Sequence, residues 1–506
     1  MTPLLSPDQA WLPLPDDQWT PQHARHLLRR AGWTAIPADV DRAMKDGLQA
    51  TLARIFPASP PAFTPPPLMA DGIRRAQELR QRARETVEVD RKRMLERDAR
   101  ELHRQYMDEL AIRWLQQAAK PAASAFEKWL LFLSNVYVTA SDKVSNPDFI
   151  YRHWEILRNG AAGSAPALSK AVSRSPAMIV YLDLQGSHLK APNENFAREL
   201  MELFTLGEGN YTEDDIKEAA RAFTGYRHRE GEFRFAKRQH DATPKTLFGQ
   251  TGNYDGDDVI DLIYKKPAAA TFLPREMAKF YLAGDPPDAE WFAPLGAWWR
   301  GKNYNLRQLC FRFFGSRAFY HESFQANYIK SPVQYYVGLL QDLQLDVVPF
   351  VRTTLVPLRQ MGQTVFRPPN VRGWVGGRVW INASTLAARR QLVATLFTPF
   401  REERLNADDQ RALAVARSDG AKKFAVDNDR LREFSQLGSE KITSRFVDYF
   451  LPVPVNTDFR ATLRDFLATA ADDRKNRKET GGGNPDVGRV REAAIVVLQT
   501  PEYQLC

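Results

Sequence analysis

Residues 192–207 read Pro-Asn-Glu-Asn-Phe-Ala-Arg-Glu-Leu-Met-Glu-Leu-Phe-Thr-Leu-Gly and have the clearest helical periodicity in the chain. Asn193 is placed to cap a helix that ends at Gly207 and Gly209. At ~100° per residue, one face of this helix is polar and the other is apolar. The polar face holds Glu194, Asn195, Arg198, Glu199 and Glu202, and the apolar face holds Phe196, Leu200, Leu203 and Phe204. The pattern predicts an amphipathic helix docked on a core.

A second helix follows this one directly. Thr212 precedes three acidic residues, 213–215, which is typical of a capping box with carboxylates at the positive end of the helix dipole. The helix is expected to run through Glu218 and Arg221 and to stop at Gly225. The two segments together predict a helical hairpin at the centre of the chain.

The polar face of this hairpin carries three carboxylates that can converge: Glu199, Glu202 and Glu218. Neighbouring carboxylates can bind a hard divalent cation or act as general acid and base. Arg198 and Arg221 are near enough in sequence to pair with them, so a buried ion-pair network and a plain solvent-exposed face remain open as alternatives. The spacing also lacks the Glu-x-x-His pattern of di-metal bundles, and the sequence does not indicate which residues would bind a metal.

The rest of the chain predicts a mainly α protein: a large, bundle-like helical core with long loops and one or two short hairpins. Strands are expected only at residues 232–235 and in a hairpin around 374–381. Residues 1–20 are expected to form an N-terminal extension, 21–400 the helical core and 401–506 a helical C-terminal extension. Residues 71–120 contain mixed charges and predict one long charged helix or a bent pair.

Composition excludes several classes of protein. The 506 residues include only two cysteines, too few for a disulfide framework. The net charge of +9 is a mild bias, and residues 71–120 contribute only about +3 of it, so nucleic-acid binding is not favoured. The start of the chain lacks a signal-peptide pattern, which predicts a cytoplasmic protein. No apolar run reaches the ~20 residues that a membrane span needs, so no membrane-spanning helix is expected.

The central hairpin also carries a resemblance. The segment 192–207, with 210–213 and 220–225, closely resembles the signature of the bacterial family called domain of unknown function 1800. Further matching motifs extend the resemblance over nearly the whole chain; they lie at residues 26–32, 176–183, 240–249, 255–260, 330–332, 366–374 and 499–503. Such coverage implies one family-wide helical architecture.

The family resemblance implies little about activity. Members are often exported and often encoded beside a protein of the alkaline-phosphatase or sulfatase-like type. Here no signal is visible, and the Trp-His-Asn-His-Phe motif that commonly follows Glu-Lys is replaced: Ser134 and Val136 stand at the two histidine positions. If those histidines serve a metal or a proton transfer in relatives, this chain has lost that role, which favours a scaffolding function.

Two further groups of residues are candidates for a site. His240 next to Asp241 is the best acid–base candidate, because an imidazole beside a carboxylate can titrate near neutrality; a satisfied loop pair is the alternative. Residues 366–377 form a rigid loop rich in aromatic residues and arginine that predicts a cleft wall or simple packing. Its candidate binding residues are Arg367, Asn370 and Trp374, with Trp380 just beyond.

Two functions follow, the first from the family resemblance and the missing histidines, the second from the residue patterns. The first is a helical partner or scaffold of a phosphatase- or sulfatase-like neighbour. The second is a hydrolase-type enzyme with a carboxylate-lined cleft, with or without a divalent cation, in which Glu199, Glu202, Glu218, His240 and Asp241 are catalytic. Arg198, Arg221, Asn193 and Asn195 would then bind the ligand or the partner. The chain contains no Gly-x-Ser-x-Gly, His-Glu-x-x-His or phosphate-binding loop motif.

Overall fold

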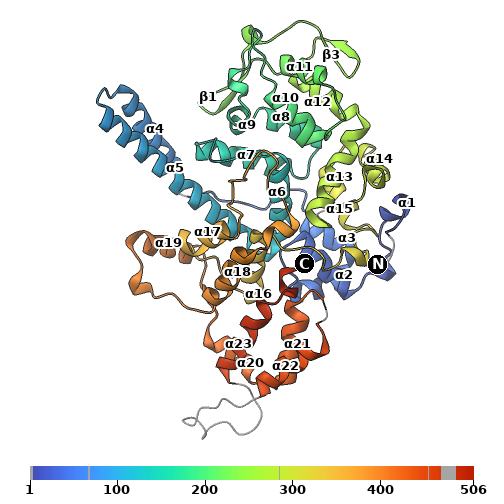
Figure 1. The fold of residues 1–506 in the computed structure, drawn as a ribbon, viewed down its shortest axis with the longest axis vertical. Helices are drawn as coiled ribbons and strands as arrows, with labels where there is room; N and C mark the ends of the chain where they lie inside the picture. Colours follow the sequence, from blue (N-terminus) through green and yellow to red (C-terminus); the bar gives the residue numbers. More distant parts are fainter. Residues whose placement is uncertain (1–3, 67–68, 284, 454, 469–485) are drawn as a thin grey trace.

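The computed structural model describes residues 4–66, 69–283, 285–453, 455–468 and 486–506, and these are predominantly α-helical, as the sequence predicts (Figure 1). In this part of the chain the only sheets are two antiparallel two-stranded ones. β1 (Tyr226–Arg229) pairs with β2 (Glu232–Phe235), and β3 (Lys245–Leu247) pairs with β4 (Gln250–Gly252). The strand expected at 232–235 is confirmed.

The central body is built from helices that are far apart in sequence. They are α1 (Pro7–Ala10), α2 (Pro21–Ala31), α3 (Pro37–Ile55), α6 (Ser124–Val136), α13 (Pro267–Tyr281), α14 (Ala293–Arg300), α15 (Leu306–Phe314) and α16 (Pro332–Leu343). The Arg30 side chain of α2 is buried and links α2 to the end of α13 and to the end of the chain. It donates to Tyr281 O at 2.7 Å and to Cys506 O at 2.9 Å. The C-terminal residues therefore lie against α2.

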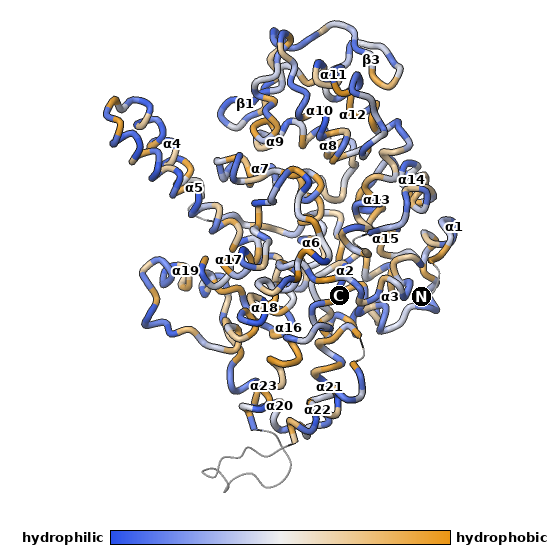
Figure 2. Tube along the Cα trace, viewed as in Figure 1, coloured by the Kyte–Doolittle hydropathy of each residue, from blue (hydrophilic) through white to orange (hydrophobic). Residues whose placement is uncertain are grey.

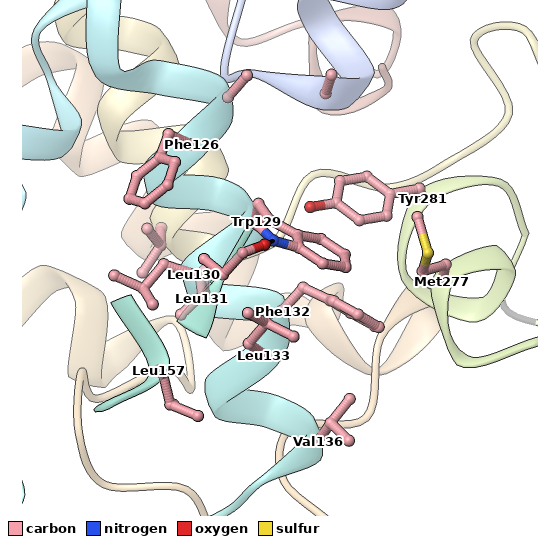
Figure 3. Packing of buried hydrophobic residues seen from close by; sticks show 14 of the residues in the cluster. Phe126, Trp129, Leu130, Leu131, Phe132, Leu133, Val136, Leu157, Met277 and Tyr281 are labelled. Atoms are coloured by element: carbon pink, nitrogen blue, oxygen red, sulfur yellow. Dashed lines mark hydrogen bonds between the residues drawn. The ribbon is translucent and has the colours of Figure 1, made fainter. Parts of the chain in front are cut away.

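Helix α6 is the core helix of this body, with buried side chains on all its faces (Figure 3). Trp129, Leu130 and Leu133 are at most 1% exposed. In Figure 3, Met277 and Tyr281 of α13 lie on one side of the helix and Leu157 on another. A helix that is apolar all round must be enclosed by other elements, so α6 fixes where its neighbours pack.

The upper part of the molecule in Figure 1 contains the segment that decides the fold. Its helices are α7 (Pro147–Gly160), α8 (Ala165–Ser173), α9 (Pro176–Tyr181), α10 (Asn195–Glu199), α11 (Glu213–Ala222) and α12 (Gly256–Lys265). The capping box predicted at the start of α11 is confirmed: Thr212 Oγ1 accepts from Asp215 N at 3.1 Å, and the Asp215 carboxylate accepts from Thr212 N at 2.9 Å.

Residues 71–120 form a hairpin of two helices. Of the two predicted possibilities, the structure has the bent pair and not the single long helix. α4 (Met69–Glu85) and α5 (Val89–Ala118) run side by side and extend from the body (Figure 1). Arg80 Nη2 of α4 donates to His103 Nδ1 of α5 at 3.0 Å. The hairpin is mainly hydrophilic along its length, with apolar residues interspersed (Figure 2).

The remaining helices lie on the opposite side of the body from α8–α12 (Figure 1). They are α17 (Val351–Gln360), α18 (Ala383–Leu396), α19 (Ala407–Ser418), α20 (Asn428–Ser435), α21 (Ser439–Phe450), α22 (Thr457–Ala468) and α23 (Val487–Leu498). The hairpin expected around residues 374–381 is wrong: this segment is an irregular loop with one 3₁₀ turn, Gly377–Trp380, and Trp374 N bonds to Asn135 Oδ1 of α6 instead of to a partner strand. No helix in the described residues is long and apolar enough to cross a bilayer.

Buried histidines are part of this core, and His153 of α7 is a clear case. A carbonyl can only accept, so His153 Nε2 carries the hydrogen and donates to Tyr137 O at 2.9 Å, while Nδ1 accepts from Ser175 Oγ at 3.1 Å. Burial lowers the pKa of His153 to about 4. Both ring nitrogens are therefore satisfied only while the imidazole is neutral.

The free energy of unfolding is expected to fall as the pH drops from about 6.5 towards 4. In this window the unfolded chain binds a proton at residue 153 and the folded chain does not, so unfolding is favoured by about 1.4 kcal/mol per pH unit. Chemical denaturation between about pH 6.5 and pH 5 measures this slope. His153→Gln, which cannot titrate, should have a shallower slope, and an unchanged slope in this variant would contradict the assignment.

Candidate functional site

The first helix of the central hairpin changes its winding in the middle. α10 continues into a π-helical turn, η4 (Leu200–Thr205), where the sequence predicts α-helix throughout. At its end Leu206 N and Gly207 N both donate to Met201 O, at 2.8 and 3.0 Å. π-helical turns are rare and are frequently found at functional sites. This turn places Glu202, Leu203, Leu206 and Gly207 on the wall of a cavity.

The cavity has a volume of about 810 Å³ and lies between η4, α6, α13 and the loop that contains Trp374. Its aromatic walls are Trp33, Phe132, Phe272, Phe280, Tyr328, Trp374 and Trp380, and its charged side chains are Lys128, Glu202, Glu208, Arg275, Glu276, Lys279, Glu290 and Arg372. Small-molecule sites are commonly apolar clefts of about 300–1,000 Å³ with a few placed polar groups. The cavity lies within this size range, and its lining is richer in charged side chains than that of a typical site.

Glu202 is the predicted acid that lines this cavity, and two neighbours fix its side chain. Arg372 Nη2 pairs with Glu202 Oε1 at 2.8 Å and with Glu208 Oε1 at 3.0 Å. The Tyr211 hydroxyl donates to Glu202 Oε2 at 3.1 Å. Burial, and then the charge of Glu202, raise the pKa of Glu199 one turn earlier. The two acids thus have different environments, one ion-paired and one more easily protonated.

Glu218 belongs to a different cluster, held together by Arg221. Arg221 Nη1 donates to Glu218 Oε2 at 2.7 Å, and Arg221 Nε donates to Asp241 Oδ2 at 2.7 Å. Burial acts to raise the pKa of Asp241, but hydrogen bonds from Arg221 and Thr243 outweigh it and hold that pKa well below its usual range. Arg221 therefore lies between the two acids, and this cluster is the ion-pair network that the sequence left open as an alternative to a site.

His240 bonds away from its carboxylate neighbour. Its Nδ1 donates to Thr224 O at 3.0 Å, and its ring packs against Phe235 with centroids 5.0 Å apart. Lys245 Nζ donates to the backbone oxygens of Asp241 and Thr243. The interactions of both His240 and Asp241 are thus those of a satisfied loop.

The other predicted residues divide between structural contacts and the cavity. The sequence predicts that Asn193 caps α10, but the cap position is Glu194, whose side chain makes no capping hydrogen bond; Asn193 Oδ1 accepts from Asn195 N at 2.9 Å just before it. Arg198 pairs with Glu213 at 2.8 Å. Asn370 Oδ1 accepts from Arg372 N at 2.9 Å, and Arg367 pairs with Asp142. Trp374 and Trp380 line the cavity. The loop is therefore a cavity wall, as the sequence suggested.

The positions of the two missing histidines do not face one another. Val136 lines the large cavity, whereas Ser134 lines a separate small cavity of about 30 Å³ and donates to Leu131 O at 2.8 Å. Residues two apart on an α-helix point about 200° away from each other. Side chains at 134 and 136 of this chain therefore lead into different cavities. In the described residues no three His, Cys, Asp or Glu side chains are grouped to hold a metal ion.

Two residues of α6 that the sequence analysis did not single out lie at the cavity: Lys128 and Asn135. Lys128 is only 3% exposed, and its Nζ donates to Gly32 O at 2.9 Å. Burial lowers the pKa of Lys128 to about 7. The available signal was the charged pair Glu127-Lys128 at the start of the most apolar run in the chain.

Asn135 holds the loop that forms the opposite wall. Its Oδ1 accepts from Trp374 N at 2.7 Å and its Nδ2 donates to Trp374 O at 3.4 Å. Gly373 has φ +75°, and a Cβ there would lie 2.3 Å from Asn135 Oδ1, so glycine is required for this close approach. Asn135 thereby sets the position of both Trp374 and its neighbour Arg372.

The chain belongs to the family described as protein of unknown function (DUF1800), whose family model matches residues 26–505. Neither the curated proteins nor the solved structures contain a match to it.

Asn135→Ala is expected to loosen the loop 366–380, because Trp374 loses both of its backbone hydrogen bonds to α6. Hydrogen–deuterium exchange measured by mass spectrometry should show faster exchange in these residues. Ser134→Ala is the matched control, since Ser134 bonds only within its own helix. Equal exchange in the two variants would show that Asn135 does not hold the loop.

Proposed function

We propose that this family member binds a small organic molecule in the central cavity and acts on it as a hydrolase-type enzyme. The observation that carries the proposal is the cavity of about 810 Å³ whose wall contains Glu202, ion-paired with Arg372 and hydrogen-bonded to Tyr211. A carboxylate fixed in this way can accept a proton from an attacking water or orient a substrate hydroxyl.

Glu199 would be the acid of the pair. Burial and the neighbouring Glu202 raise its pKa, so it is more readily protonated than an exposed glutamate. Paired carboxylates whose environments push their pKa values apart are a common arrangement for general acid–base chemistry. Because Glu202 lines the cavity and Glu199 does not, Glu199 would act through Glu202 or after a shift of the π-helical turn.

The proposal does not use a divalent cation. Arg372 already neutralises Glu202, and Arg221 lies between Glu218 and Asp241. A cation at either place would have to displace an arginine that makes charge-assisted hydrogen bonds. Glu218, His240 and Asp241 therefore contribute to the stability of the upper part of the fold in this proposal and not to the reaction.

Ligands are best found by a thermal-shift screen of small metabolites, followed by hydrolysis assays with ester, phosphoester, glycoside and amide substrates. For a substrate found in this way, Glu202→Gln should lower kcat by at least about 100-fold, the usual contribution of a general acid or base. Glu213→Gln is the control, because Glu213 is exposed and pairs only with Arg198 outside the cavity. Equal rates for the two variants would contradict the role of Glu202.

A second candidate function is that of a partner protein, and the α4–α5 hairpin favours it. The hairpin protrudes from the body (Figure 1), and Val87 at its tip is 96% exposed, with Val89 and Met94 also exposed. Exposed apolar side chains on a protruding element are suited to docking. The partner in this proposal is the phosphatase- or sulfatase-like protein suggested by the family resemblance.

Affinity purification from native cells tests this second function. The wild-type protein should recover the phosphatase- or sulfatase-like neighbour, and a triple variant with serine at Val87, Val89 and Met94 should lose it. Val496→Ser is the control, because Val496 is a similarly exposed valine on α23. Recovery by the triple variant, or no such partner with the wild type, would contradict the proposal.

A further inference from the structure

Lys128 is the unusual charged group of the cavity. It lies on the cavity wall, and its side chain is almost completely buried. The Nζ atom lies 5.6 Å from the ring centroid of Trp33 and 5.7 Å from that of Tyr281. Within the described residues no carboxylate lies within ion-pair distance of it, whereas its sequence neighbour Glu127 is paired with Arg158. A buried lysine without an acid is unusual, because an isolated buried charge is costly.

The geometry also orients the amine. Lys128 Nζ donates one hydrogen to Gly32 O at 2.9 Å. A neutral amine that donates a single hydrogen bond keeps its lone pair available for attack. Lysines desolvated in apolar pockets or placed near other cations are the ones that act as nucleophiles towards carbonyl groups. The cavity beside the amine is large enough for a small carbonyl compound.

A second cation of the same cavity is unpaired. Arg275 of α13 lines it, and among the described residues its guanidinium has no ion pair, with a buried Nε that lacks a hydrogen-bond partner. The other cations of the lining are neutralised: Lys279 pairs with Glu276 at 2.5 Å, and Arg372 pairs with Glu202. An unpaired arginine is suited to a ligand carboxylate.

We infer that Lys128 forms a covalent imine with a small 2-oxo acid bound in the cavity, and that Arg275 binds the carboxylate of that ligand. The amine nitrogen attacks the carbonyl carbon, and the C–N bond forms as the carbonyl oxygen takes up a proton from the nitrogen. Loss of that hydroxyl with the remaining amine proton, as one water molecule, leaves the C=N bond. The step needs no oxidant, reductant or further reactant. It rests on the cavity of the proposed function but not on the roles of Glu199 and Glu202.

The pKa of Lys128 is set by burial and by the charged groups around it. Burial is the main cause of its low pKa, Arg30 and Lys330 lower it further, and the ionisable group of Cys506 raises it. The Tyr281 hydroxyl is buried, and burial raises its pKa well above the usual value, so Tyr281 stays neutral. At neutral pH the neutral amine is therefore a much larger fraction of Lys128 than of an exposed lysine.

The test uses the whole protein with glyoxylate as the probe and cyanoborohydride to reduce any imine to a stable carboxymethyl group. Peptide mapping by mass spectrometry should show modification of Lys128 at least tenfold faster than of the exposed lysines at neutral pH. Its rate should rise with a midpoint near pH 7. Preferential modification of other lysines, or an even distribution, would overturn the inference.

Variants separate the parts of the inference. Lys279→Met is the matched control, because Lys279 lines the same cavity but is ion-paired; this variant should keep the modification at Lys128. Lys128→Met should lose it, and the wild-type peptide map decides the question should this variant fail to fold. Arg275→Gln should slow modification by glyoxylate but not by propionaldehyde, which has no carboxylate; equal effects on both probes would overturn the role of Arg275.

The inference and the proposed function can fail separately. Glu202→Gln should leave the modification of Lys128 unchanged. Modification without hydrolytic activity on any substrate would contradict only the hydrolase proposal. Hydrolytic activity that depends on Glu202, without modification of Lys128, would contradict only the imine.

Discussion

The burial of two adjacent ionisable side chains, Glu127 and Lys128, is the constraint on which the rest of the structure depends. Both lie on α6, whose apolar residues point in every direction, so the helix must be enclosed and these two side chains must be enclosed with it. Glu127 is compensated: Arg158 of α7 pairs with it at 2.7 Å, and Trp114 Nε1 of α5 donates to it at 3.0 Å. Removal of Arg158 would leave Glu127 buried without an ion pair, and removal of Trp114 would leave one of its oxygens without a hydrogen bond. These bonds fix α5, α6 and α7 relative to one another.

The other side of α6 creates the cavity. Lys128 and Asn135 lie two turns apart on this helix, and each holds a segment of irregular backbone: Lys128 bonds Gly32 O after α2, and Asn135 bonds Trp374 in the loop. Backbone polar groups buried outside helices need partners of this kind. The space between the two segments is closed by α13 and by the π-helical turn η4. The cavity is therefore a consequence of how α6 is packed and not of one flexible surface loop.

Much of the fold was predictable from local pattern. The amphipathic central hairpin, the capping box of α11 and the mainly helical class all follow from side chains within a few residues of one another. The pairing of Arg221 with Glu218 could also be considered from the sequence, because the two residues are only three positions apart. The π-helical turn was not predictable, because Leu200–Thr205 has the apolar spacing of an ordinary α-helix and its extra residue per turn is imposed by packing. The loop at 374–381 resembles a hairpin locally, but its bonds go to Asn135, more than 200 residues earlier.

The charges of the cavity divide into those the protein satisfies and those it does not. Glu202 and Glu208 share Arg372, and Glu276 has Lys279. Glu290 is exposed, where water can solvate it. Lys128 and Arg275 remain, and both are basic. A site whose acids are all paired or solvated, and which keeps two unpaired basic side chains, has an electrostatic preference for a ligand with acceptor oxygens, although the chain as a whole is only mildly basic. That preference is set by side-chain pairing within one cavity, which net charge and composition cannot reveal.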